Sequence, residues 1–76
     1  MNTKLSLVKI GEVVTIKSLV DSYLKPRMTE LGLVSGKKLR VLFRAPLGGP
    51  FAFDLGGYVL SLRLDEAKLI IVSLRK

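Results

Sequence analysis

Runs in which apolar and polar residues alternate, separated by glycine and proline, constrain the fold of this chain most strongly. A period of two is typical of a strand that buries one face. The run from Lys38 to Arg44 has this period. Its buried face is predicted to hold three apolar residues, Leu39, Val41 and Phe43. Its opposite face is predicted to hold three cations, Lys38, Arg40 and Arg44. Such a stripe could dock an acidic surface, or it could simply be solvated.

A hairpin is predicted after this strand. Residues 51–55 and 58–62 both alternate, and Gly56-Gly57 between them permits the positive φ that a tight hairpin turn requires. The two strands should therefore pair antiparallel with their apolar side chains on one face. That face is predicted to hold Phe51, Phe53, Leu55, Tyr58, Leu60 and Leu62.

Two more strands lie nearer the ends of the chain. Residues 13–19 are rich in β-branched side chains, with Val14 and Ile16 predicted on the buried face. The final strand is predicted over residues 69–74. Its continuous apolar run, Leu69 to Val72, indicates either burial on both faces or a sheet edge that pairs with a second copy of the chain.

Residues 45–50, Ala-Pro-Leu-Gly-Gly-Pro, predict an irregular loop between two of the strands. The two prolines cannot donate backbone hydrogen bonds, and the two glycines favour turn conformations. Leu47 lies at the centre of this loop. Its side chain could face a partner, or it could fold back and plug the end of the sheet.

Short helical segments complete the prediction. Residues 24–31 are predicted to contain a short helix that ends at Gly32, a residue free to adopt the left-handed conformation. Its buried face is predicted to hold Leu24, Met28 and Leu31. Residues 64–67 predict one helical turn capped by Asp65, and residues 1–4 predict a frayed tail.

These elements predict a mainly β fold. About five short strands, with one short helix between strands 1 and 2, are expected to close into a small SH3-like barrel that hides its edges. Residues 1–76 are expected to form a single domain, since the chain is close to the smallest size that supports one core. No run approaches the roughly 18 apolar residues that span a bilayer, so a soluble cytoplasmic protein without membrane insertion is expected.

Cysteine and histidine are both absent from the chain. Their absence removes disulfides, thiolate chemistry, zinc sites and the usual general base. The six carboxylates are scattered, with only Asp65 and Glu66 adjacent. No enzyme activity, metal site or cofactor is therefore expected.

The formal net charge of +7 on 76 residues is the strongest compositional signal. It predicts an acidic partner, which could be nucleic acid, an anionic membrane surface or an acidic patch on another protein. Net charge alone does not distinguish these partners, and a basic protein with no acidic partner is the alternative.

Four blocks of sequence occur in order at compatible spacings: Arg27–Leu33, Ser35-Gly36, Arg44–Pro50, and Gly57–Arg63 followed by Glu66-Ala67. Together they resemble the FeoA family of ferrous-iron transport proteins, over nearly the whole chain. The resemblance implies an SH3-like barrel, a cytoplasmic location and an accessory role beside the ferrous-iron permease, whose cytoplasmic part carries a GTPase domain. Two positions depart from the family pattern: Gly49 replaces a usual acidic residue, and Gly56 replaces a frequent charged residue.

The leading hypothesis is a non-enzymatic module that docks on the GTPase-bearing portion of the permease and modulates transport. An apolar anchor beside a charged rim is typical of small interfaces. The predicted partner-binding residues are those of the loop and the cationic stripe, Pro46, Leu47, Gly48, Gly49, Pro50, Lys38, Arg40 and Arg44.

The alternative hypothesis is a basic small barrel that binds nucleic acid or acts as a regulatory domain. The predicted strands argue against it, because they turn the aromatic residues inward and leave only Tyr23 for base stacking. Direct iron binding is a third hypothesis, and it would need carboxylates from distant parts of the chain or from a dimer.

Overall fold

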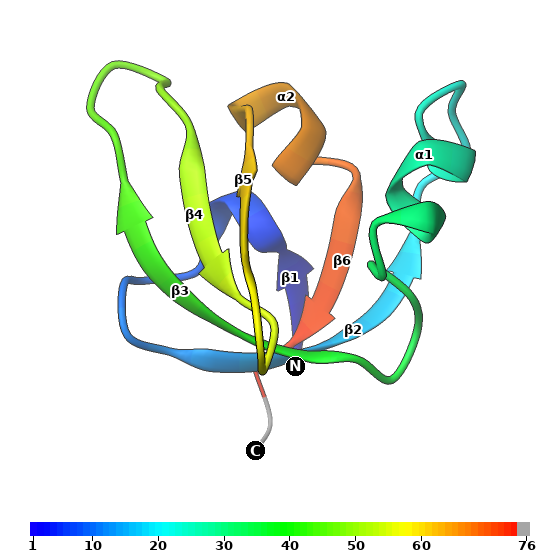
Figure 1. Cartoon of the computed structure of the whole chain (residues 1–76), viewed down its shortest axis with the longest axis horizontal. Helices are drawn as coiled ribbons and strands as arrows, with labels where there is room; N and C mark the ends of the chain where they lie inside the picture. Colours follow the sequence, from blue (N-terminus) through cyan, green and yellow to red (C-terminus); the bar gives the residue numbers. More distant parts are fainter. Residues whose placement is uncertain (75–76) are drawn as a thin grey trace.

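The computed structural model describes residues 1–74, which form one strongly curved antiparallel sheet with short helical segments around it (Figure 1). The strands are β1 (Asn2–Lys4), β2 (Val13–Leu19), β3 (Lys38–Arg44), β4 (Phe51–Asp54), β5 (Val59–Leu62) and β6 (Ile70–Ser73). The helical segments are a 3₁₀ turn, η1 (Leu5–Leu7), and two helices, α1 (Lys25–Glu30) and α2 (Leu64–Ala67). The strand order is β1-β6-β2-β3-β4-β5. The mainly β, SH3-like prediction is confirmed, with six strands in the described residues where about five were expected.

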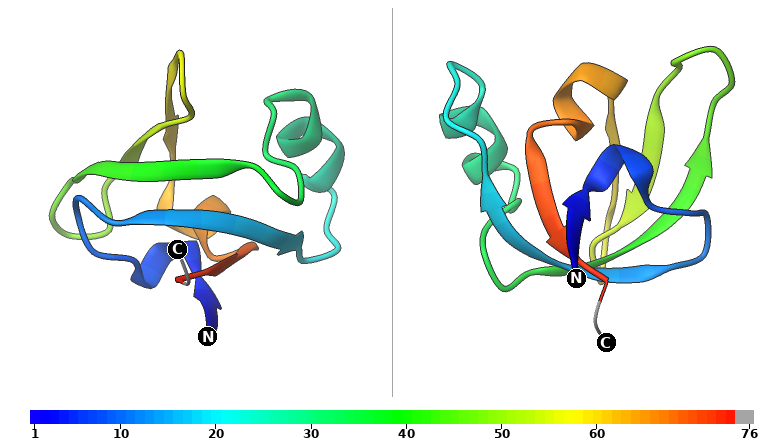
Figure 2. Two further views of the ribbon diagram at one scale, coloured as in Figure 1. Left: turned by 90° about the horizontal axis from the view of Figure 1, so that it is seen from below. Right: turned by 180° about the vertical axis from the view of Figure 1, so that it is seen from behind.

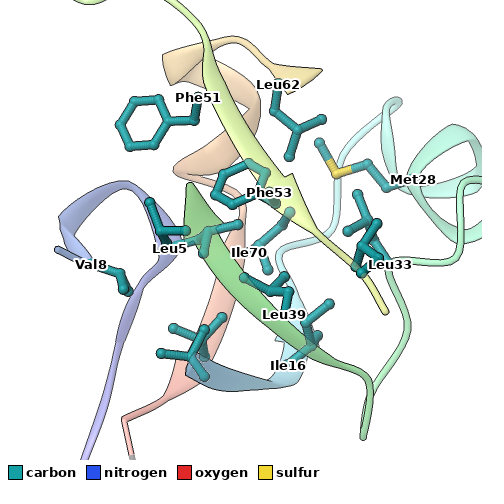
Figure 3. Close-up of a cluster of buried hydrophobic side chains, with 14 residues drawn as sticks. Leu5, Val8, Ile16, Met28, Leu33, Leu39, Phe51, Phe53, Leu62 and Ile70 are labelled. Atoms are coloured by element: carbon teal, nitrogen blue, oxygen red, sulfur yellow. The ribbon is translucent and has the colours of Figure 1, made fainter. Parts of the chain in front are cut away.

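The concave side of the sheet encloses the hydrophobic core (Figure 3). The rings of Phe51 and Phe53 stack there, with their centroids 6.0 Å apart. Met28 from α1 and Leu33 after it are buried against the same cluster, so α1 covers one end of the barrel, as predicted. Val14 and Ile16 are buried too, as the alternation in residues 13–19 predicted.

Strand β3 departs from the predicted alternation in its second half. Its pairing with β4 shifts register between Val41 and Phe43, so that Leu42 is an extra residue in the ladder. Such a bulge turns the residues after it toward the opposite faces. The predicted burial of Phe43 is therefore wrong, because its side chain is 54% exposed. Arg44 moves the other way: it lies opposite the buried Phe51, on the concave side rather than on the outer face.

The β4–β5 hairpin forms around Gly56-Gly57 as predicted, with positive φ at both glycines. The expected burial of Tyr58 is wrong, because the ring is 47% exposed. Its hydroxyl instead donates a 2.9 Å hydrogen bond to the carbonyl oxygen of Leu31, at the end of α1. Gly32, at φ +93°, allows this approach, because a Cβ there would collide with the Tyr58 hydroxyl.

The ends of the two helices differ in how well they were predicted. Helix α1 stops before Gly32, as expected. Helix α2 has the predicted bounds, but Asp65 is not its cap. The cap position is Arg63, whose backbone N–H donates a 2.9 Å bond to Oε1 of Glu66. The carboxylate that accepts a hydrogen bond from the cap residue is therefore that of Glu66, one residue after the predicted Asp65.

The terminal strands also correct the prediction. Residues 2–4 form β1, which pairs antiparallel with β6, so the predicted frayed tail is wrong (Figure 2, right). Strand β6 lies between β1 and β2, with Ile70 and Val72 fully buried. The run Leu69 to Val72 is therefore not a sheet edge, and pairing of two copies through it is excluded. The edge strands of the described sheet are β1 and β5.

Candidate docking surface

The loop between β3 and β4 is closed by its own backbone. The Ala45 N–H donates to the Pro50 carbonyl oxygen over 3.0 Å, and the Gly49 N–H donates to the Pro46 carbonyl oxygen over 3.2 Å. The loop projects at the end of the hairpin, away from the C-terminus (Figure 1, upper left). The five predicted loop residues are therefore brought together in one turn.

Leu47 is at the tip of this turn and its side chain is fully exposed, with a relative accessibility of 103%. The hypothesis that it plugs the barrel end is therefore wrong. Its φ is +59°, the only positive φ at a non-glycine residue in residues 1–74. A left-handed conformation costs an L-residue about 1–2 kcal/mol. The loop thus displays a large apolar side chain at the cost of local strain.

The two glycines of the loop have different structural roles. Gly48 continues the left-handed turn with φ +76°, and a Cβ there would lie in ordinary contact, 3.6 Å from Cδ2 of Leu64. A Cβ at Gly49 would lie 2.5 Å from the Cβ of Ala45. Position 49 therefore has no room for a side chain in this loop, and no carboxylate stands there to pair with a cation.

The three predicted cations do not form one stripe. Lys38 and Arg40 lie on the outer face of the sheet, where Arg40 is opposite Asp54. Arg44 lies beyond the bulge, with its guanidinium 4.9 Å from the centroid of the Phe51 ring. This cation–π contact holds Arg44 at the base of the loop. Of these three cations Arg44 therefore lies nearest to the loop, and Lys38 lies up to about 20 Å further along the strand at 3.3 Å per residue.

Two apolar residues missed by the sequence prediction border the same loop. Leu42 and Phe43 are exposed at the bulge, just before Arg44. The only sequence signal was that the apolar pair interrupts the strict alternation of the strand. With Leu47 they provide three exposed large apolar side chains within six consecutive residues of the β3–β4 hairpin.

The charged groups of the chain are unequally satisfied. Five of the six carboxylates accept a hydrogen bond from a backbone N–H or a lysine within the chain: those of Glu12, Asp21, Asp54, Asp65 and Glu66. By contrast, Lys25 is the one cation in residues 1–74 that forms an ion pair, with Asp21. The surplus of positive charge is therefore available to a partner.

Two structural observations bear on metal and membrane binding. Residues 1–74 contain no cluster of three or more potential His, Cys, Asp or Glu metal ligands. In the same residues, no helix has the length and apolar character needed to cross a membrane.

Comparison with known proteins gives a consistent result. The family model described as the FeoA domain matches residues 3–74. No curated protein matches the chain by sequence.

Several solved structures share the fold. An FeoA-like protein from Clostridium acetobutylicum is 34% identical with a TM-score of 0.89, covering 99% of this chain and 88% of that one. FeoA from Chlorobium tepidum is 37% identical with a TM-score of 0.86, covering 97% of this chain and 71% of that one. Stenotrophomonas maltophilia FeoA complexed with zinc is 28% identical with a TM-score of 0.80, covering 96% and 89%. That protein is described as a prokaryotic SH3 domain protein and a candidate ferrous-iron transport activating factor.

Proposed function

The chain belongs to the FeoA family, and from this premise we propose that it is a cytoplasmic accessory protein of ferrous-iron uptake that docks on the permease. The docking site on the permease is its GTPase-bearing cytoplasmic portion, and docking modulates transport. The chain supplies a binding surface and no catalytic group. The surface on this chain is the β3–β4 loop with the residues at its base.

The exposed, strained Leu47 is the observation that carries this proposal. Fold stability gives no reason for a leucine at φ +59° in full contact with water. Residues held in costly conformations cluster at functional sites, where another requirement outweighs the strain. An apolar side chain presented on a closed loop is suited to fill a pocket of the partner, because the loop is already ordered before binding.

The surrounding residues extend this anchor into an interface. Leu42 and Phe43 add exposed apolar area at the base of the loop, and Arg44 adds a cation held over Phe51. Lys38 and Arg40 lie on the outer face, further from the anchor. Their contribution is to the rate of association with an acidic partner surface rather than to the contact at the centre.

The test is a binding measurement with the purified cytoplasmic portion of the permease, comparing the wild type with Leu47→Asp. A central apolar anchor contributes about 2 kcal/mol or more, so affinity should fall by more than about tenfold. Leu7→Asp is the matched control, because Leu7 is also an exposed leucine, 67% accessible, but lies in η1 and has no positive φ. Undiminished binding by folded Leu47→Asp protein would remove the loop from the proposal.

Modulation is tested in the same system by measuring GTP hydrolysis and iron uptake. Added wild-type protein should change at least one of these rates, and Leu47→Asp protein should not. A response to both proteins would show that the effect on transport does not pass through the loop.

Nucleic-acid binding is the second candidate, and the structure removes one argument against it. Tyr23, Phe43 and Tyr58 are all at least partly exposed, whereas the sequence predicted only Tyr23 outside the core. Exposed rings and unpaired cations are the components of a single-strand binding surface. A gel-shift titration with single-stranded DNA at low salt distinguishes the candidates, since a salt-sensitive shift would favour this one.

A further inference from the structure

Strand β5 leaves one side of its backbone unpaired. It is an edge strand of the described sheet, and its other side pairs with β4. The Leu55 N–H donates to the Tyr58 carbonyl oxygen, so these two residues form a hydrogen-bonded pair. From there, non-hydrogen-bonded and hydrogen-bonded pairs alternate along the two strands of the hairpin. By this alternation, Leu60 and Leu62 bond β4, and the N–H and C=O groups of Val59 and Ser61 point to the free edge. Both residues are exposed.

The open part of this edge is short, because the chain closes it at both ends. At one end, the Tyr58 hydroxyl crosses to the Leu31 carbonyl oxygen. At the other end, the Arg63 N–H is already bonded to the Glu66 carboxylate. Two residues of β5 therefore remain able to pair with an added strand.

A groove of about 510 Å³ lies beside the second half of this edge and is lined by residues from β5 and from the start of α1. This volume lies within the range of about 300–1,000 Å³ that is typical of ligand sites. Leu24 and Arg27 line the α1 side, and Ser61, Leu62 and Arg63 line the β5 side. The groove therefore offers the unpaired backbone of Ser61, two guanidinium groups and, where Asp65 and Glu66 line it, two carboxylates.

Natural edge strands are usually protected by shortness, a charge, a proline or a bulge, and of these only shortness applies to β5. Val59 to Leu62 are all uncharged, and the pairing of β5 with β4 has no register shift. Strand β1, the other edge, contains Lys4. The exposed β5 edge thus resembles the strand edges that accept an extended peptide as an additional strand.

We propose that the β5 edge binds a short, extended, acidic segment of another protein by strand addition. Arg27 and Arg63 have no ion-pair partner in the described residues, so their guanidinium groups can pair with carboxylates of the segment, while the carboxylates of Asp65 and Glu66 are held at the start of α2 by the backbone hydrogen bonds that they accept. The net charge of +7 on the chain also favours an acidic segment over a basic one. A second copy of the chain is disfavoured as the occupant, because it would bring another +7 of charge to the same edge. This site does not involve Leu47 and does not depend on the identity of the docking partner.

The probe is a capped ten-residue peptide of alternating glutamate and valine, titrated into the full-length protein and followed by amide NMR. The amides of Val59 and Ser61 should shift, and their hydrogen exchange should slow by about tenfold or more, because each gains a strand partner. The same peptide with lysine in place of glutamate should not bind. Shifts confined to residues 45–50, or equal binding of the lysine peptide, would overturn the proposal.

The guanidinium groups are tested with charge-matched variants. Arg27→Gln with Arg63→Gln should weaken binding of the glutamate peptide by about fivefold or more, as expected for the loss of two exposed ion pairs. Lys9→Gln with Lys17→Gln removes the same charge at exposed positions that do not line the groove, and should leave affinity nearly unchanged. Equal losses of affinity in both double variants would show that only the net charge of the protein matters, and would contradict a specific role of Arg27 and Arg63.

The backbone contact is tested at Ser61. Ser61→Ala keeps the N–H and should bind normally, whereas Ser61→Pro removes it and should abolish binding, since edge strands tolerate proline where the N–H faces solvent. If the proline variant fails to fold, the exchange rate of the Ser61 amide in the wild type decides the point. Concentration-dependent protection of Ser61 without peptide would identify a second copy as the occupant and refute the acidic segment.

Discussion

The two consecutive hairpins of the sheet meet the same backbone requirement with different residues. The β4–β5 turn has positive φ at Gly56 and Gly57, where no side chain is strained. The β3–β4 turn has positive φ at Leu47 and Gly48. The first turn is also anchored, since Oδ1 of Asp54 accepts a 2.8 Å bond from the Gly56 N–H and Tyr58 reaches α1. The second turn is held by its own backbone hydrogen bonds and, at its base, by the stacking of Arg44 on Phe51.

Under the proposed docking function, this difference separates a turn that serves folding from a turn that serves contact. Glycine at a left-handed position costs the folded state little, while leucine there costs about 1–2 kcal/mol. Leu47 also gains no burial that would offset this cost. The anchored hairpin therefore supports the barrel, whereas the strained one exposes the side chain that we propose contacts the partner.

The largest stability effect is expected at Gly49, where the strained turn has no spare volume. Gly49→Ala should lower the free energy of unfolding by about 2 kcal/mol, because the new Cβ would lie 2.5 Å from the Cβ of Ala45. Urea denaturation measures this loss. In a double-mutant cycle, Ala45→Gly should recover part of it by removing the crowded methyl group. Additive losses would show that Ala45 is not the source of the crowding.

A smaller effect is expected where the anchored hairpin meets α1. Tyr58→Phe removes the hydroxyl that bonds the Leu31 carbonyl oxygen and should cost about 1 kcal/mol in urea denaturation. Relative to the wild type, amide hydrogen exchange should speed up more in α1 than in β2. Tyr23→Phe is the matched control, since Tyr23 is 90% exposed, and should leave stability unchanged. Equal effects of the two variants would mean that the hydroxyl does not anchor the helix.

Much of the fold follows from local pattern. Features that depend on a few neighbouring residues were predicted correctly, because residue alternation and glycine positions determine them locally. They are the bounds of two strands, Val13–Leu19 and Lys38–Arg44, the turn at Gly56-Gly57 and the helix end at Gly32. The bulge at Leu42 was not predicted, because it depends on the register with β4. This single extra residue reversed the expected faces of both Phe43 and Arg44.

The candidate site was predictable in position but not in geometry. The composition Pro-Leu-Gly-Gly-Pro located the loop, yet it did not show whether Leu47 is buried or exposed. The prediction of a single cationic stripe was wrong because the bulge at Leu42 places Arg44 on the concave side of the sheet. Residues 2–4 show no strand pattern of their own, and they form β1 only because β6 offers an edge at the other end of the chain.

The smallest stability effect tests the comparison most directly, because it should have the opposite sign. Asparagine tolerates the left-handed conformation better than leucine, so Leu47→Asn should stabilise the fold by about 0.5 kcal/mol. The same variant should weaken binding to the cytoplasmic portion of the permease by about tenfold, since the apolar anchor is gone. Leu7→Asn, at an exposed site with no positive φ, should change neither stability nor affinity by much.

Thermal and urea denaturation measure the change in stability, and a binding titration measures the change in affinity. If Leu47→Asn were less stable than the wild type, leucine would contribute to the fold itself, and the distinction between the two hairpins would fail.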